Sequence, residues 1–375
     1  MKFTVQRDVL NDAVSWVAKS LSPRPPAPVL SGILIKGESG VLTLSSFDYE
    51  TSARLEIEAD IQEEGTILVP GRLLAEVIRS FPASATITAE TEGSKVQLTC
   101  RSSRFALATM PDAEYPELPA LPDVSGTVDG ADFATAVSQM TVAASKDDTL
   151  PILTAVRLEF EADKITFLAT DRYRLAMREL PWRPNATDIS TSALVKARTL
   201  DSVAKSLASG GDLSIALKDD ADLIGFESSS RRQTSLLVDG DYPKIRSLFP
   251  ESTPIHAVVN TAELVGAVNR VKVVAERNTP IRLAFTDGAV TLDAGTGEDA
   301  QASESISAQL EGEEITVAFN PLYLSEGLGA FSSEYVRFSF TSAPKPAMIT
   351  AQHELEGEDE GDYRYLVMPV RLPNY

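Results

Sequence analysis

The residue types that most often carry out chemistry are scarce in this chain. Its two histidines, His256 and His353, have no cysteine or acidic partner at the spacing of a metal site. The segment His353–Gly357 lacks the second histidine of the zinc-protease motif. There is no Gly-x-Ser-x-Gly elbow and no phosphate-binding P-loop. The sequence therefore disfavours hydrolytic and nucleotide-driven enzymes.

One glycine-rich segment, Gly295–Ala300, matches the loose dinucleotide pattern and follows a predicted strand. However, Glu298 and Asp299 stand where a pyrophosphate needs positive potential, and residues 301–307 alternate instead of continuing as a helix. The acid-rich run 353–362 lacks the ordered aspartate spacing of a calcium loop. We interpret the first as an acidic turn and the second as a solvated loop, and we expect no cofactor and no metal.

Basic side chains recur at matched positions in two predicted helices. Arg72 and Arg79 lie seven residues apart in one helix, and Arg198 and Lys205 take the equivalent places 126 residues later. In the earlier helix they lie opposite a predicted apolar stripe, made of Leu73, Leu74, Val77 and Ile78. A solvated face is the ordinary interpretation of such pairs, and contact with phosphates is the alternative.

The stretch Phe167–Ala176 begins as an apolar strand, turns at Thr170-Asp171 and then exposes cationic, aromatic and aliphatic side chains in succession. It either simply ends a strand or forms one wall of an apolar peptide-binding groove. The apolar C-terminal run Leu366–Leu372 favours the groove, because chain ends are usually polar and frayed. The candidate lining residues are Leu150, Leu153, Leu175, Pro243, Leu248, Met368, Pro369 and Val370.

The elements that position these residues repeat along the chain. Thr166–Ala176 echoes Thr43–Ala53, and further matches recur at offsets near 125 in a third copy that begins near Ile255. Such a period is too long for a solenoid, so each copy is a domain. We predict three tandem α+β domains, each with two helices and about eight strands, at residues 1–122, 123–250 and 251–375. Helical periodicity predicts helices that include residues 8–19, 71–81, 130–144 and 261–274.

Composition sets the broad class. The 375 residues are 43% hydrophobic and 23% charged, which is globular composition, and the formal net charge of -20 argues against a uniformly nucleic-acid-coating surface. The single cysteine, Cys100, cannot form an intrachain disulfide. The first residues carry charge too early for a signal peptide, and no apolar run reaches the ~18 residues of a membrane span. We expect a soluble cytoplasmic protein.

Three motifs carry a family resemblance. They are Ala-Thr-Asp-x-x-Arg-Leu-Ala at 169–176, Val-Asp-Gly-x-x-Pro at 238–243 and Met-Pro-x-Arg-Leu at 368–372. With the threefold repeat, they make the chain resemble the bacterial sliding clamps, the beta subunits of DNA polymerase III, over its entire length. The resemblance implies a head-to-tail homodimer that closes a ring of six domains, with helices lining the hole and sheets forming the outer shell.

The resemblance also assigns residues. The basic residues that would face double-stranded DNA are Arg24, Arg72, Arg79, Lys146, Lys196, Arg198 and Lys205. The dimer interface would use Arg104, Phe105, Val273, Val274 and Glu304. The peptide-binding groove would consist of Leu150, Leu153, Thr170, Arg172, Tyr173, Arg174, Leu175, Pro243, Leu248, Leu366, Val367, Met368, Pro369, Val370 and Arg371. Arg172 and Tyr173 depart from the Gly and His of better-known relatives, and Leu150 stands where an arginine is often found, so the preferred peptide would differ.

The function implied by the resemblance is that of a non-catalytic, nucleoid-associated processivity factor that encircles DNA without reading its sequence. Its expected partners are the replicative polymerase alpha subunit, translesion polymerases and repair proteins, bound through short peptides, and an ATP-driven clamp loader that opens the ring. A peptide-binding adaptor that never encircles DNA is the alternative, and the matched basic pairs speak against it. An oxidoreductase built on Gly295–Ala300 is the third and weakest hypothesis.

Overall fold

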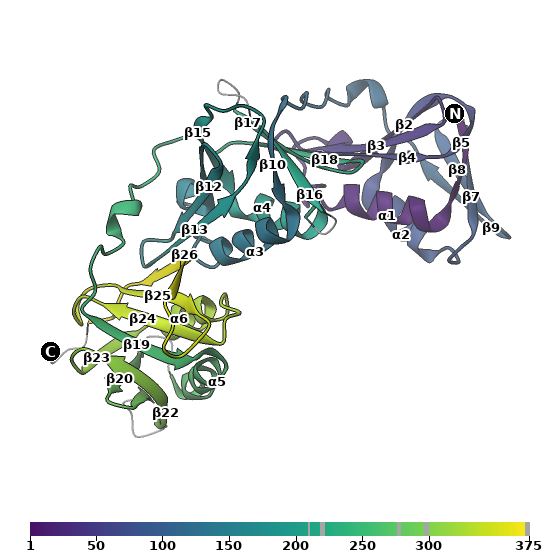
Figure 1. Cartoon of the computed structure of the whole chain (residues 1–375). Helices are drawn as coiled ribbons and strands as arrows, with labels where there is room; N and C mark the ends of the chain where they lie inside the picture. Colours follow the sequence, from purple (N-terminus) through teal and green to yellow (C-terminus); the bar gives the residue numbers. More distant parts are fainter. Residues whose placement is uncertain (209–210, 218–221, 276–278, 296–299, 372–375) are drawn as a thin grey trace. The chain divides into compact units, whose positions relative to one another are not determined.

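The computed structural model describes residues 1–208, 211–217, 222–275, 279–295 and 300–371. The chain forms two compact units, each built from two stretches of sequence. Unit 1 comprises Met1–Gly130 and Ser202–Leu237, and unit 2 comprises Ala131–Asp201 and Val238–Tyr375 (Figure 1). The middle part of the chain thus contributes to both units.

The described residues contain two α-helices in each copy of the repeat. They are α1 (Arg7–Ala18), α2 (Gly71–Ser80), α3 (Gly130–Thr141), α4 (Ala197–Ser206), α5 (Thr261–Val271) and α6 (Pro321–Leu328). The four helices predicted from periodicity are confirmed with ends that differ by up to three residues. None of the helices in the described part of the chain is long and apolar enough to cross a membrane.

Unit 1 contains two antiparallel sheets. One has the order β5-β1-β7-β8-β9, and the other runs β10-β16-β17-β18-β4-β3-β2-β6 within this unit. The strands are β1 (Lys2–Gln6), β2 (Gly32–Glu38), β3 (Val41–Phe47), β4 (Thr51–Glu58), β5 (Asp60–Glu63), β6 (Gly65–Pro70), β7 (Thr86–Glu92), β8 (Lys95–Cys100), β9 (Ser103–Ala108), β10 (Val124–Asp129), β16 (Asp212–Leu217), β17 (Leu223–Ser228) and β18 (Arg231–Leu236).

Unit 2 is built on one sheet with the order β15-β11-β12-β13-β26-β25-β24-β19-β22-β21-β20-β23. Its strands are β11 (Ala155–Glu161), β12 (Lys164–Thr170), β13 (Arg174–Pro181), β15 (Ser190–Lys196), β19 (Ile255–Asn260), β20 (Ile281–Thr286), β21 (Ala289–Ala294), β22 (Ala302–Glu311), β23 (Ile315–Phe319), β24 (Tyr335–Phe340), β25 (Ala347–Gln352) and β26 (Asp359–Val367). The short β14 (Arg183–Pro184) also belongs to this stretch of the chain.

Both units join strands from two copies of the repeat into one continuous sheet. In unit 1, β18 of the second copy pairs with β4 of the first. In unit 2, β13 of the second copy pairs with β26 of the third. Each junction between copies is therefore made by backbone hydrogen bonds as well as by side chains.

The predicted apolar stripe of α2 is wrong at one position. Leu73 is 47% exposed, whereas Leu74, Val77 and Ile78 are buried as predicted. Leu73 lies three residues before the exposed Glu76 and so shares that outer face of α2. The buried stripe is completed by Ala75 instead.

Candidate functional site

The turn between β12 and β13 is held by its own side chains. The Asp171 Oδ1 atom accepts hydrogen bonds from the backbone N–H groups of Tyr173 (3.0 Å) and Arg174 (3.1 Å). The Thr170 hydroxyl donates to the Arg174 carbonyl (2.9 Å) and accepts from the Arg172 N–H (3.1 Å). Arg172 has a φ of 82°, a left-handed conformation that is unfavourable for a side chain as large as arginine. The turn thus presents Arg172 and Tyr173 at the surface in a defined geometry.

The C-terminal strand runs beside this turn. Arg174 and Leu175 of β13 pair with Val367 and Leu366 of β26, and the Met368 N–H donates to the Tyr173 carbonyl at 2.9 Å. Beneath the turn, a buried apolar cluster combines side chains from three stretches of the chain. Its members are Leu168, Leu175, Met177, Tyr242, Ile245, Phe249 and Leu366. The fold therefore brings together residues that are about 200 positions apart in the sequence.

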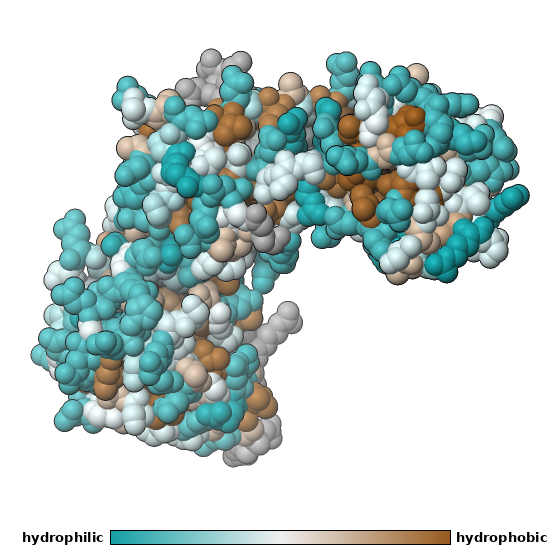
Figure 2. Space-filling view, turned by 45° about the vertical axis from the view of Figure 1, so that its right-hand side comes forward, coloured by the Kyte–Doolittle hydropathy of each residue, from teal (hydrophilic) through white to brown (hydrophobic). Residues whose placement is uncertain are grey.

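Thirteen of the fifteen predicted groove residues fall into two layers, and the other two, Leu150 and Pro369, have intermediate exposure. The exposed layer contains Arg172, Tyr173, Pro243, Leu248, Met368, Val370 and Arg371. The buried layer contains Leu153, Thr170, Arg174, Leu175, Leu366 and Val367. Tyr173 is 53% exposed and Leu248 is 56% exposed. The face of the molecule drawn in Figure 2 is mainly hydrophilic, with hydrophobic residues in separate patches. We call the apolar side chains of the exposed layer, namely Tyr173, Pro243, Leu248, Met368 and Val370, the C-terminal patch.

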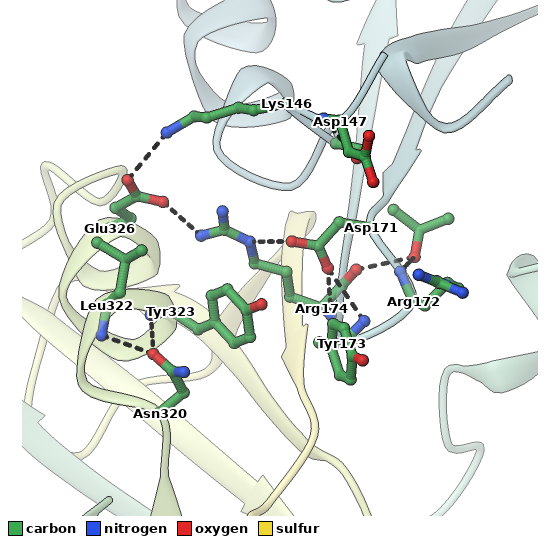
Figure 3. A network of polar contacts seen from close by, with 12 residues as sticks. Lys146, Asp147, Asp171, Arg172, Tyr173, Arg174, Asn320, Leu322, Tyr323 and Glu326 are labelled. Atoms are coloured by element: carbon green, nitrogen blue, oxygen red, sulfur yellow. Dashed lines mark hydrogen bonds and ion pairs between the residues drawn. The ribbon is translucent and has the colours of Figure 1, made fainter. Parts of the chain in front are cut away.

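Arg174 is 3% exposed, and its guanidinium is paired on two sides. Its Nε atom lies 2.9 Å from Asp171 Oδ2, and its Nη1 atom lies 2.6 Å from Glu326 Oε2 (Figure 3). Burial lowers the pKa of Arg174, but the neighbouring Tyr365, Glu326 and Asp171 outweigh burial and raise it. Arg174 consequently remains charged and links the second copy to the third.

The partners of Arg174 on α6 were not identified from the sequence. The Asn320 side chain caps this helix by accepting hydrogen bonds from the N–H groups of Leu322 (2.9 Å) and Tyr323 (3.3 Å). The Tyr323 ring stacks on Tyr173 with centroids 5.9 Å apart, and the Arg174 guanidinium lies 4.6 Å from its centroid. The Asn-Pro pair at 320–321 is a local signal for a helix start, but no local signal links Tyr323 or Glu326 to a turn 150 residues earlier.

Three of the predicted DNA-facing residues surround one hollow of about 900 Å³ in unit 2. Lys146, Lys196 and Arg198 line it together with Glu326, and Lys146 Nζ lies 3.2 Å from Glu326 Oε1. The Lys146 side chain nevertheless stays 75% exposed. The other predicted DNA-facing residues are also exposed, namely Arg24, Arg72, Arg79 and Lys205.

The predicted dimer residues lie on or beside open strand edges. Within the described residues, β9 pairs only with β8, and residues 302–307 of β22 pair only with β21. Phe105 on β9 is 39% exposed and packs edge-on against Phe81, while Val273 is 80% exposed. Glu304 is already bound to Arg270, whose hydrogen bonds hold the pKa of the Glu304 carboxyl below its usual value.

The two histidines considered first for enzyme chemistry each contact a residue on another strand or loop. His256 hydrogen-bonds to the Ser339 hydroxyl at 3.1 Å, and burial lowers its pKa. His353 pairs with Glu360. The described part of the chain contains no cluster of three or more histidine, cysteine or acidic residues that could hold a metal ion. Gly295–Ala300 lies mostly outside the described residues.

Three family models match consecutive parts of the chain. The N-terminal, central and C-terminal domains of the DNA polymerase III beta subunit match residues 1–119, 127–244 and 246–371, respectively. Together these matches cover nearly the whole sequence in the order expected for three tandem domains.

Individual proteins agree with the family models. The beta sliding clamp of Micrococcus luteus is 68% identical over 83% of this chain and 100% of its own length. That of Streptomyces coelicolor is 51% identical over 99% of this chain and 100% of its own length. The crystal structure of the Pseudomonas aeruginosa sliding clamp bound to griselimycin superposes with a TM-score of 0.92 and 26% identity, over 99% of this chain and 100% of that one.

Proposed function

The chain belongs to the DNA polymerase III beta subunit family, the DNA sliding clamps, and from this membership we propose how its own residues serve that function. Two copies close head to tail into a ring of six clamp domains around duplex DNA. The ring tethers the replicative polymerase alpha subunit by topology. The match of all three family domains in order along one chain is the observation that carries this proposal.

The distribution of charge supports loose contact with the DNA backbone. The chain has a net charge of -20, yet the seven basic residues proposed to face DNA are all at least partly exposed. Phosphate contacts made by such side chains are independent of sequence, and the acidic remainder of the protein repels DNA. Weak contacts of this kind hold the duplex inside the ring and still permit sliding.

The two open strand edges support ring closure. An unpaired edge is a template for pairing with another chain, and β9 and β22 offer one edge each. We propose that β9 of one protomer lies along β22 of its partner, with Phe105 packed near the partner's Val273 and Val274. Arg104 then shares Glu304 with Arg270, the present partner of that carboxylate.

The C-terminal patch supports peptide binding. Most of its exposed aromatic and aliphatic side chains lie one or two positions from members of a buried apolar cluster, and an apolar surface of this kind can accept the anchor residues of a short extended peptide. Because a similar clamp was crystallised with griselimycin, we propose that this compound also binds here, in competition with partner peptides.

We propose that the chain itself is non-catalytic and works in the cytoplasm on the nucleoid. An ATP-driven clamp loader opens the ring, and translesion polymerases and repair proteins take turns with the replicative polymerase at the C-terminal patch. The departures at Arg172 and Tyr173 alter which peptides bind best and leave the ring unaffected.

Retention on circular and linearised DNA tests the topological link. The chain is incubated with its clamp loader, ATP and nicked circular DNA, and half of the sample is then cut with a restriction enzyme. Retention on circles and loss from linear molecules is the expected result. Equal retention on both forms would mean ordinary electrostatic binding, and absence from both would favour a peptide-binding adaptor. A charge-reversed Arg72→Glu/Arg79→Glu variant is expected to load less efficiently, because two proposed phosphate contacts become repulsive.

A further inference from the structure

Glu326 belongs to none of the residue sets predicted from the sequence, and it forms an ion pair with Arg174, a cation that is only 3% exposed. Its Oε2 atom is 2.6 Å from Arg174 Nη1, and its side chain is 27% exposed. Burial raises the pKa of this carboxyl, but hydrogen bonds from Arg174 and Lys146 outweigh burial and lower it. Glu326 is thus an ionised group in a partly desolvated position, where charge pairs are stronger than at an open surface.

Arg174 contacts both Glu326 and an aromatic ring. The guanidinium lies 4.6 Å from the centroid of the Tyr323 ring while it binds Glu326 on one side and Asp171 on the other. A cation held by two carboxylates has a fixed location, so the ring that lies beside it is fixed as well. The backbone carbonyl of Tyr323 also accepts a hydrogen bond from the Tyr365 hydroxyl at 2.8 Å.

The Tyr323 ring in turn supports the exposed Tyr173. The two rings are nearly parallel, with an interplanar angle of 20° and centroids 5.9 Å apart. The carbonyl of Tyr173 accepts the Met368 N–H, which ties the same residue to the C-terminal strand. A continuous series of contacts therefore leads from Glu326 through Arg174 and Tyr323 to the C-terminal patch (Figure 3).

We propose that Glu326 is a positioning residue for peptide binding, acting through Arg174 on the Tyr323–Tyr173 stack. This inference rests on the proposed binding of peptides at the C-terminal patch. Loss of the Glu326 charge leaves Arg174 with Asp171 as its only carboxylate partner among the contacts described, so the guanidinium and the stacked rings are no longer fixed from both sides. The other partner of Glu326, Lys146, is too exposed for its ion pair to fix the ring.

The test compares Glu326→Gln with a matched control. Griselimycin binding to the full chain is measured by calorimetry at neutral pH, and we expect Glu326→Gln to weaken it about fivefold to tenfold. Glu179→Gln is the control, because Glu179 is 33% exposed, forms an ion pair with Lys164 at 3.0 Å and belongs to the same unit. The control is expected to bind like the unmodified chain.

A double-mutant cycle separates positioning from a general loss of structure. If Glu326 acts through the Tyr323 ring, Glu326→Gln costs less than about twofold when Tyr323 is already leucine. An equal cost in both backgrounds would overturn the proposed route. Should Glu326→Gln fail to fold, Glu326→Asp takes its place. It keeps the charge, but its side chain is shorter by one methylene and withdraws the carboxylate from its 2.6 Å contact with Arg174, so the same weakening is expected.

A variant of the buried apolar cluster, which we call the floor variant, distinguishes a failure of this inference from a failure of the proposed peptide site. Leu175→Ser/Leu366→Thr changes the buried cluster under the C-terminal patch. If this variant loses griselimycin while Glu326→Gln binds it normally, the site stands and the positioning role is wrong. If the floor variant binds normally, or the unmodified chain does not bind at all, the proposed site itself is wrong.

Discussion

Two turns, one in each unit, share a backbone and differ in side chains. Asp48 Oδ1 accepts from the N–H groups of Glu50 (3.0 Å) and Thr51 (2.7 Å), as Asp171 does from Tyr173 and Arg174. Tyr49 and Arg172, the residues after the aspartates, both have positive φ values, 71° and 82°. We call these the first turn and the second turn.

The neighbouring strands also match. The Leu236 N–H donates to the Glu50 carbonyl at 2.8 Å in unit 1, and the Met368 N–H donates to the Tyr173 carbonyl at 2.9 Å in unit 2. Leu236 and Met368 have similar exposure, 43% and 39%. Repetition of the sequence has therefore reproduced the backbone frame at both junctions between copies.

The side chains paired beneath the two turns have opposite character. Under the first turn, Ser52 pairs with Thr234, and their buried hydroxyl groups hydrogen-bond at 2.5 Å. Under the second, Leu175 pairs with Leu366 within an apolar cluster. The hydroxyl groups of the polar pair are hydrogen-bonded to each other and provide little apolar surface for the anchor residue of a peptide, whereas the leucine side chains are wholly apolar. The comparison indicates that the backbone frame is common to both junctions, and we propose that side-chain chemistry restricts peptide binding to the second.

The largest expected effect is a difference in how far one substitution in each turn lowers the unfolding free energy. Arg174→Ala leaves Asp171 and Glu326 without their shared buried cation, so we expect the unfolding free energy to fall by about 3–5 kcal/mol. Thr51→Ala at the matched position of the first turn should cost about 1 kcal/mol or less. Denaturant titrations followed by circular dichroism measure both, and equal losses would contradict the distinction.

Exchanging the paired side chains tests the chemistry directly. Leu175→Ser/Leu366→Thr gives the second turn the same pair of side chains that lies beneath the first turn. We expect griselimycin binding to weaken by at least about tenfold through loss of apolar contact. Thr234→Val, which alters the first turn alone, serves as the control and should leave binding as it was. If the double variant keeps its affinity for griselimycin, the paired side chains beneath the turn do not determine where the compound binds.

The exposed aromatic residues give a smaller contrast. Tyr173 and Tyr49 have nearly the same exposure, 53% and 51%, but only Tyr173 lies on the proposed peptide site. Tyr173→Ala is expected to weaken griselimycin binding about fivefold, since a stacked anchor surface is removed. For Tyr49→Ala the calorimetric titration should match that of the unmodified chain, and a comparable loss would place a second binding site at the first turn.

The smallest effect is a pH dependence that only the second turn should show. The pKa of Glu326 is lowered in the folded chain, so its stabilising contribution is present above the ordinary glutamate pKa of about 4.3 and is lost as the pH falls through the lowered value. The melting temperature of Glu326→Gln should accordingly lie below that of the unmodified chain at pH 7 and approach it in acid. A gap that stays constant between pH 7 and pH 3 would contradict this assignment.

Local sequence patterns were sufficient to predict the helices and the recurrence of the turn. The α2 helix follows from apolar spacing, and Asp48 and Asp171 identify two turns whose hydrogen bonds are local. Leu73 was misassigned because it lies at the border of the apolar stripe, where periodicity alone does not decide burial.

Such local patterns did not predict the contacts between segments that are far apart in the sequence. The stack of Tyr173 on Tyr323 and the ion pair of Arg174 with Glu326 join residues 150 and 152 positions apart. Nothing in either segment alone indicates the other, because both contacts depend on the sheet that runs from β13 into β26. Leu175 was predicted from the residues around the turn and Leu366 from the family resemblance, whereas the residues on α6 were missed altogether.

Because strands of neighbouring copies pair within one sheet, the copies of the repeat cannot be separated without breaking a sheet. The second copy supplies β18 to a sheet of unit 1 and β13 to the sheet of unit 2. Excised on its own, it would carry two freshly exposed strand edges, which are templates for aggregation. Although the sequence repeats as three copies, the compact bodies do not follow the repeat, because the middle copy is divided between the two units.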